Sequence, residues 1–310
     1  MSVLTHLSRL CRLGLLPLAC AGLAAAQPAC AAEAGSPASS HESFHDLQVD
    51  VVGSGRPVLM IPGLNSPASV WADTCAALQP VQCHLVQLPG FAGAAPVASA
   101  HFLQDMRDRL LAYVDAKHLG PVAVVGHSLG GELALMMAEK SPASVDRLVI
   151  VDSLPFLGAM RDPSATATSM QPVAERMRAQ MLSATPAQFE TSTRDVARGM
   201  AKSPADVDRL VAWGAASDRA TMAQAWYELW TTDLRPELAA IRCPVLVLGS
   251  WAAYAPMGAT QDVTRAIFAA QYANLAGVQI HMSAAGYHFL MWDDRDWLVG
   301  EVRGALRAGS

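Results

Sequence analysis

One serine of this chain stands in a setting that could make it a nucleophile. Residues 126–130 read Gly-His-Ser-Leu-Gly, with Ser128 in the middle. A serine hydroxyl is a weak nucleophile unless a base takes its proton, so an enzyme must hold it within reach of that base. A sharp turn between a strand and a helix does so, and the crowding there admits only very small residues two positions before and after the serine. The pattern predicts nucleophilic catalysis by Ser128; a buried structural serine is the alternative.

The residues on either side of this turn favour the nucleophile. Residues 122–125 are Val-Ala-Val-Val, an apolar run typical of a buried strand in a parallel sheet. Residues 132–140 are good helix formers, and the run ends at Ser141 and Pro142. Strand, turn and helix therefore follow one another in the order that this kind of serine requires.

The rest of the chain must position this serine, and it alternates strand-like and helix-like segments. Because repeated strand–helix units with apolar strands form parallel sheets covered by helices, we expect an α/β fold with a mostly parallel central sheet and helices on both faces. Strands are predicted near residues 44–52, 58–61, 83–88, 122–125, 147–152, 244–249 and 278–282, and helices near 69–78, 101–118, 132–140 and 293–307.

Residues 153–240 interrupt this alternation. They lack strand-like runs and fall between two predicted strands, so we expect a helical lid inserted into a core of residues 44–152 and 241–310. Flexible methionines and large aromatic residues in this stretch suit a pocket for apolar groups, although most of them would form the core of the lid itself. The residues expected to contact substrate are Met160, Trp226 and Trp230.

These motifs and their order resemble the capped α/β-hydrolase superfamily, in particular its serine esterase and lipase-like branch. The resemblance runs from about Phe44 to the final helix. Residues 60–65, Met-Ile-Pro-Gly-Leu-Asn, resemble the His-Gly loop of this family, with Pro62 in place of the usual histidine. The resemblance implies that the backbone amides of Leu64 and Leu129 form an oxyanion hole, and the replacement by Pro62 leaves that amide donor in place.

The same resemblance implies a general base. His288 lies in the segment Gly-Tyr-His-Phe, residues 286–289, which follows the last predicted strand. The family carries its catalytic histidine in this loop, so the fold could bring His288 back over Ser128 despite their separation along the chain. A structural role for His288 is the alternative.

The third member of the triad is less clear from the sequence. The family usually carries its acid shortly after the strand at 244–249, but position 252 is an alanine. Some members carry the acid after the strand that follows the nucleophile helix, and Asp152 has that place. We therefore expect Asp152 to orient the histidine; Asp262, or no acid at all, remain alternatives.

The N-terminus has the features of an export signal. Arg9 and Arg12 precede a short apolar run that ends in small residues and is too short and too interrupted to span a membrane. We expect a signal peptide at 1–26, with cleavage there or as late as residue 32, and a flexible spacer at 27–43. The residues before Cys20 fit a lipid-anchor signal poorly. The mature protein would then be periplasmic or secreted, without stable insertion in a membrane.

Cysteines and charge limit the other classes of function. Export would allow a disulfide between Cys75 and Cys83, although the sequence does not give their geometry. Cys243 precedes a buried-looking strand and fits an inert thiol. No Cys/His cluster has metal-ligand spacing, and a net charge of −5 without a basic patch argues against a nucleic-acid partner. We expect no cofactor and no metal; the oligomeric state is left open.

The combined prediction is an exported serine hydrolase. It would cleave a carboxylic ester, thioester or lactone with an apolar acyl or alcohol group through an acyl-enzyme. A serine at position 128, where an aspartate would be needed, argues against the epoxide hydrolase and dehalogenase branches. Two alternatives remain: amide hydrolysis, C–C bond hydrolysis or cofactor-free haloperoxidase chemistry at the same site, and a non-catalytic protein that binds a small molecule.

Overall fold

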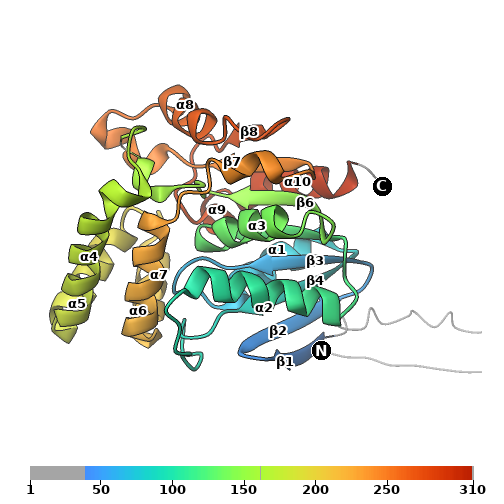
Figure 1. Ribbon diagram of the computed structural model, residues 1–310, viewed down its shortest axis with the longest axis horizontal. Helices are drawn as coiled ribbons and strands as arrows, with labels where there is room; N and C mark the ends of the chain where they lie inside the picture. Colours follow the sequence, from blue (N-terminus) through green and yellow to red (C-terminus); the bar gives the residue numbers. More distant parts are fainter. Residues whose placement is uncertain (1–38, 161, 309–310) are drawn as a thin grey trace, which may run out of the picture. The chain divides into compact units, whose positions relative to one another are not determined.

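Eight strands form a single sheet in the computed structural model, which describes residues 39–160 and 162–308 (Figure 1). Their order across the sheet is β1-β2-β4-β3-β5-β6-β7-β8. β2 runs antiparallel to β1 and β4, and every other neighbouring pair is parallel. The strands are β1 (Ser39–Phe44), β2 (Leu47–Gly53), β3 (Arg56–Ile61), β4 (Val81–Gln87), β5 (Val122–His127), β6 (Val145–Val151), β7 (Val245–Gly249) and β8 (Gln279–Met282).

Helices cover both faces of this sheet. They are α1 (Ala72–Leu78), α2 (Phe102–Ala116), α3 (Leu129–Lys140), α8 (Gln261–Gln271), α9 (Leu290–Asp293) and α10 (Arg295–Arg307). Successive side chains of a strand point to opposite faces. Along β5, Val122 and Val124 pack into the apolar cluster of α2, α3 and α8, whereas Ala123 and Val125 join that of α1, α9 and α10. The predicted mostly parallel sheet with helices on both faces is therefore confirmed.

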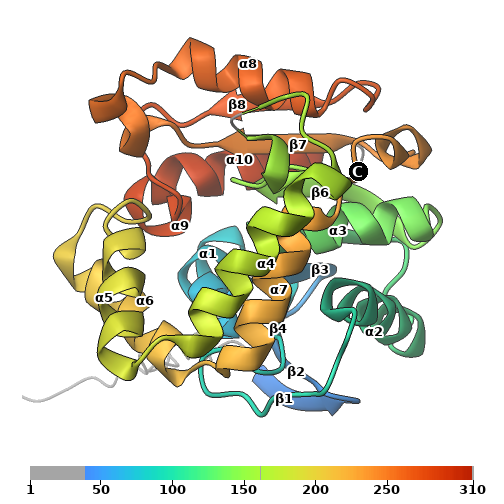
Figure 2. The same ribbon diagram turned by 60° about the vertical axis from the view of Figure 1, so that its left-hand side comes forward.

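Four helices are inserted between β6 and β7. They are α4 (Ala167–Ser183), α5 (Pro186–Ala197), α6 (Pro204–Ala216) and α7 (Arg219–Thr231). α4 packs along α7 and α5 along α6 (Figures 1 and 2). Arg178 links the first pair, because its guanidinium donates to Gln224 at 3.1 Å and stacks on the ring of Tyr227. These helices account for most of the predicted insertion; their action as a lid stays a prediction.

The predicted spacer at 27–43 is wrong for its last residues. Residues 39–43 belong to β1, which pairs with β2 in the register Ser39↔Val52 to Phe44↔Leu47. β1 is an edge strand whose side chains are largely exposed, so its sequence shows no buried face, and backbone pairing rather than apolar burial holds it. The predicted signal peptide at 1–26 and residues 27–38 lie outside the described residues. Within the described ranges, no helix is long and apolar enough to cross a membrane.

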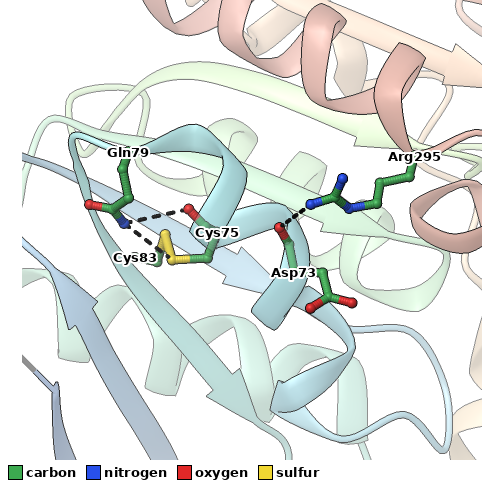
Figure 3. Close-up of a disulfide and its surroundings, with 5 residues drawn as sticks. All are labelled: Asp73, Cys75, Gln79, Cys83 and Arg295. Carbon is green, nitrogen blue, oxygen red and sulfur yellow. Dashed lines mark hydrogen bonds between the residues drawn. A yellow bond between two sulfur atoms is a disulfide. The ribbon is translucent and has the colours of Figure 1, made fainter. Parts of the chain in front are cut away.

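A disulfide joins Cys75 of α1 to Cys83 of β4 (Figure 3). The two Cα atoms lie 6.1 Å apart, and both residues are buried. The bridge that the sequence left open is therefore present. Cys243 has a free thiol whose pKa is raised to about 11 by burial, so it is held in its unreactive form.

Candidate active site

Ser128 occupies the turn between β5 and α3. Its φ of +52° lies in the left-handed region, which non-glycine residues rarely adopt. The turn is crowded, because a Cβ on Gly126 would overlap the carbonyl group of Gly130, and a Cβ on Gly130 would overlap that of Ile61. Glycine at both positions therefore lets the chain turn tightly enough to place Ser128 at the edge of the sheet.

Backbone hydrogen bonds continue past the ends of the strands and bring two predicted site residues to one edge. The amide of Ser128 donates to Val151 at 2.9 Å, and the amide of Asp152 donates to Leu248 at 2.7 Å. Because β5, β6 and β7 are parallel neighbours, their carboxyl ends meet at this edge. Ser128 and Asp152 thus follow directly on adjacent strands, as the sequence predicted.

Asp152 and His288 form a close pair at this edge. The Nδ1 atom of His288 lies 2.6 Å from Oδ2 of Asp152, and the two side chains are 20% and 11% exposed. An ionised carboxylate only accepts hydrogen bonds, so Nδ1 carries the proton and donates it. In a neutral imidazole this leaves Nε2 unprotonated, which is the state that a general base needs.

The alternative acid is elsewhere. Asp262 lies exposed in the first turn of α8 and forms no hydrogen bond or ion pair with His288. Of the carboxylates considered from the sequence, the structure brings Asp152 alone into contact with the histidine.

The hydroxyl of Ser128 is half-buried and forms no hydrogen bond with the residues that the structure describes. Serine–histidine contacts are often long in enzymes without substrate and tighten only when it binds. The neighbouring ring of His127 reinforces the arrangement, since its Nε2 lies 3.0 Å from the carbonyl oxygen of His288. Burial, and next the proximity of His288, hold the pKa of His127 well below its usual value, so this ring stays neutral.

The amides predicted for the oxyanion hole belong to residues near Ser128. Leu129 is the first residue of α3, where a helix has no internal acceptor for its N–H group. Leu64 follows Gly63, and a Cβ built on Gly63 would lie 3.1 Å from Cβ of Ser128. Within the described ranges, neither the Leu64 nor the Leu129 amide has an acceptor. Both amides are therefore free to donate, and stabilisation of a developing oxyanion requires such donors; their role as the oxyanion hole stays a prediction.

The residues predicted to contact substrate lie on the insertion. Trp226 and Trp230 lie on α7 with their ring centroids 6.1 Å apart. Met160 and Trp226 are half-buried and pack, together with Leu64, against one apolar cluster of the core. The surface hollow at the start of α2 and the one beside Trp292 include none of these residues, nor Ser128 or His288. Their contact with substrate remains a prediction.

Sequence reasoning missed the polar groups that hold the pair. Ser250, directly after β7, donates to both carboxylate oxygens of Asp152, from its amide at 2.7 Å and its hydroxyl at 2.8 Å. Asp293 accepts from the amide of Tyr287 at 3.1 Å and so braces the histidine loop. A lone serine after a strand, or a lone aspartate at the end of a helix, carries no periodic signal, so only the fold reveals these contacts. In the part of the chain that is described, no cluster of three His, Cys, Asp or Glu side chains could hold a metal ion.

Several relatives are similar in sequence to this chain. A pimeloyl-[acyl-carrier protein] methyl ester esterase from Nitrosomonas europaea is 27% identical over 208 residues, which are 65% of this chain and 79% of the esterase. Lipase LipV of Mycobacterium tuberculosis is 32% identical over 118 residues, 37% of this chain and 45% of the lipase. Several other relatives are likewise matched over less than half of their own length.

Solved structures resemble the fold. A hydrolase from Pseudomonas aeruginosa PA01 superposes with a TM-score of 0.70 at 19% identity, covering 89% of this chain and all of the other. An enol-lactonase from Burkholderia xenovorans LB400 gives a TM-score of 0.68 at 16% identity, covering 86% and 99%. The sequence profile of the alpha/beta hydrolase family matches residues 58–301, well over half of the chain. The chain therefore belongs to the alpha/beta hydrolase family.

Proposed function

We propose that this protein is an exported serine hydrolase that cleaves a carboxylic ester, thioester or lactone through an acyl-enzyme. The observation that carries the proposal is the 2.6 Å hydrogen bond between Asp152 and His288 at the sheet edge where Ser128 forms the turn. The esterase and lipase names of the relatives support ester bonds as the target. Membership of the family alone leaves other chemistries open, so the site must carry the argument.

The reaction would proceed in two halves. Nε2 of His288 takes the proton of Ser128 as its Oγ attacks the substrate carbonyl, and the amides of Leu64 and Leu129 stabilise the oxyanion. Collapse of this intermediate breaks the bond to the alcohol or thiol, which receives the proton from His288. Water, deprotonated by the same Nε2, then attacks the acyl-enzyme; the bond to Oγ of Ser128 breaks, Oγ takes the proton back from His288, and the carboxylic acid leaves. Asp152 stabilises the imidazolium that forms in each half without taking its proton.

The insertion suggests what the substrate is like. Met160, Trp226 and Trp230 are large apolar side chains on or before the helices that follow β6. Pockets for small molecules are lined mainly by such residues, with few polar groups to fix orientation. We therefore propose an apolar acyl or alcohol group in the substrate, with α4–α7 acting as its lid.

Export is part of the proposal and is supported by the disulfide between Cys75 and Cys83. Structural disulfides persist mainly in oxidising compartments, such as the bacterial periplasm or the exterior of the cell. Fractionation of cells that express the full chain, followed by mass determination of the mature N-terminus, tests this part. A chain retained in the cytoplasm with its first residues intact would contradict it.

Hydrolysis of p-nitrophenyl esters tests the chemistry. Ser128→Ala should lower kcat by about 10⁶-fold, and Asp152→Asn by about 10³–10⁴-fold, as expected when the nucleophile or the acid of a triad is replaced. Asp262→Asn is the matched control and should leave kcat and KM unchanged. Full activity of Ser128→Ala would refute the serine hydrolase, and full activity of Asp152→Asn would refute the assigned acid.

A further inference from the structure

We infer that Ser250 is a positioning residue of the acid–base pair, which holds the carboxylate of Asp152 in its orientation and sets the basicity of His288. This inference rests on the proposed function. Ser250 is 3% exposed and lies one residue beyond β7. From this place a single residue reaches both oxygens of the carboxylate.

Ser250 and His288 both form hydrogen bonds with the carboxylate of Asp152. Oδ1 of Asp152 accepts the backbone amide of Ser250 at 2.7 Å. Oδ2 accepts the hydroxyl of Ser250 at 2.8 Å and Nδ1 of His288 at 2.6 Å. The Ser250 hydroxyl and the imidazole therefore share one oxygen, and the hydroxyl fixes the direction in which that oxygen faces the ring.

The backbone of Asp152 explains why such a hold is needed. Its φ of +46° lies in the left-handed region, where a side chain with a Cβ is disfavoured. Strained residues of this kind persist only when their surroundings over-determine them, and they cluster at functional sites. The amide of Asp152 donates to Leu248 of β7 at 2.7 Å, and Ser250 of the same segment takes the carboxylate. The end of β7 thus holds both the backbone and the side chain of Asp152 by hydrogen bonds.

The hydroxyl of Ser250 should also affect protonation. A hydrogen bond to a carboxylate stabilises its charged form and disperses its charge. Without this hydroxyl, Oδ2 carries more charge toward His288 and stabilises the imidazolium more strongly. The neutral base form of His288 is then disfavoured, so activity should be lost at a higher pH as the solution is acidified.

The other titratable groups around the pair should not mask this effect. They are Tyr272 at the end of α8, Glu132 on α3, His127 on β5 and Asp293 at the end of α9. Burial raises the pKa of Tyr272, Glu132 and Asp293 and lowers that of His127. None of these four is bonded to Ser250, so a shift of the acidic limb between wild type and Ser250→Ala should report the pair of Asp152 and His288.

The pH dependence of kcat and KM for a p-nitrophenyl ester tests the inference, with Ser250→Ala, Ser250→Thr and Ser250→Cys compared with wild type. In Ser250→Ala we expect kcat to fall about tenfold with KM nearly unchanged, and the acidic limb of kcat/KM to move up by about half a pH unit. Ser250→Thr keeps the hydroxyl and should restore both kcat and the position of the acidic limb. The weaker thiol donor of Ser250→Cys should give an intermediate shift of the limb. Thermal unfolding by circular dichroism checks that each variant is folded.

Ser153→Ala is the matched control. Ser153 is the next residue after Asp152 and is 6% exposed, but its hydroxyl is bonded to neither Asp152 nor His288. Its removal should leave the acidic limb in place. If Ser250→Ala gives the wild-type limb and kcat, or if Ser153→Ala shifts the limb equally, the inference is wrong.

A second readout separates this inference from the proposed function. The proton on Nδ1 of His288 should give a low-field NMR resonance whose titration midpoint rises in Ser250→Ala and returns in Ser250→Thr. A wild-type enzyme without Ser128-dependent turnover would refute the proposed function, and the resonance would still report on Ser250. An unchanged midpoint in folded Ser250→Ala would refute the role of Ser250 even in an active enzyme.

Discussion

The sheet edge and the helical insertion are built in opposite ways. α3, which begins directly after Ser128, buries ten of its twelve residues, whereas α4 of the insertion buries one of seventeen and α5 one of twelve. Backbone bonds beyond the strand ends fix Ser128 and Asp152. The first two insertion helices depend instead on local caps, such as the capping boxes of Thr166 and Thr185.

This difference suggests a division of labour. Catalytic geometry tolerates errors of only a fraction of an ångström, so it belongs in a densely packed region. Binding of apolar groups tolerates and even benefits from adjustable walls. Substitutions at the sheet edge should therefore alter kcat or folding, and substitutions in the insertion should alter KM and the choice of substrate.

The largest effect is expected at the turn itself. In Gly130→Ala the new Cβ would overlap the carbonyl groups of Ile61 and Pro62, so the turn must open. We expect loss of soluble protein, or a folded protein whose turnover falls by more than about 10³-fold, because the nucleophile is displaced. Yield, thermal unfolding and ester turnover measure this outcome.

Gly304→Ala is its control, since a Cβ at Gly304 on α10 meets no atom within 4 Å. This substitution should be neutral or should stabilise the protein by up to about 1 kcal/mol, because alanine favours helices. If Gly130→Ala is as active and as stable as Gly304→Ala, the sheet edge around Ser128 is not as rigid as proposed.

An intermediate effect is expected in the insertion. Trp226→Ala should raise KM for esters with longer apolar chains by about tenfold and change kcat less than about twofold, since it removes binding shared by ground and transition states. Tyr227→Ala is the matched control, because the adjacent ring of Tyr227 stacks with Arg178 and lines a hollow that does not include Trp226. A fall in kcat with KM unchanged would show that Trp226 contributes to catalysis and not to substrate binding.

The smallest effect concerns stability and pH. Glu132 lies one turn after Ser128 and is 1% exposed, and burial, followed by the nearby Glu228, raises the pKa of its carboxyl group well above the usual value. The folded state thus keeps a proton that the unfolded chain releases above a pH of about 4.3. Stability should therefore fall as pH rises from that value toward the folded pKa.

Glu132→Gln removes this titration, so its Tm should exceed that of wild type by an amount that grows with pH, to about 2–4 °C at pH 8. Glu175→Gln, at an exposed position of α4, is the control and should follow wild type at every pH. Parallel curves of Glu132→Gln and wild type would show that the buried carboxyl does not titrate on unfolding.

The sequence allowed the strand–turn–helix around Ser128 to be predicted because steric crowding leaves its mark as glycines at fixed spacing. The sheet was predictable because its buried strands are continuous apolar runs. β1 was not, since an exposed edge strand has no buried face. Asp152 was preferred to Asp262 only through the family resemblance, because strand patterns locate the ends of strands but do not show which side chains meet there. The hydrogen bonds between Ser250 and Asp152 likewise depend on how β6 and β7 are aligned side by side, which strand patterns do not show.

Reaction with a fluorophosphonate, which phosphonylates activated serines, tests most directly whether Ser128 is a nucleophile activated by His288. Intact mass followed by peptide mapping is the readout. We expect one adduct per chain, on the peptide that contains Ser128, with none in Ser128→Ala and slow labelling in His288→Ala. No adduct on the folded wild-type protein, or equal labelling of Ser128→Ala, would show that Ser128 is not an activated nucleophile.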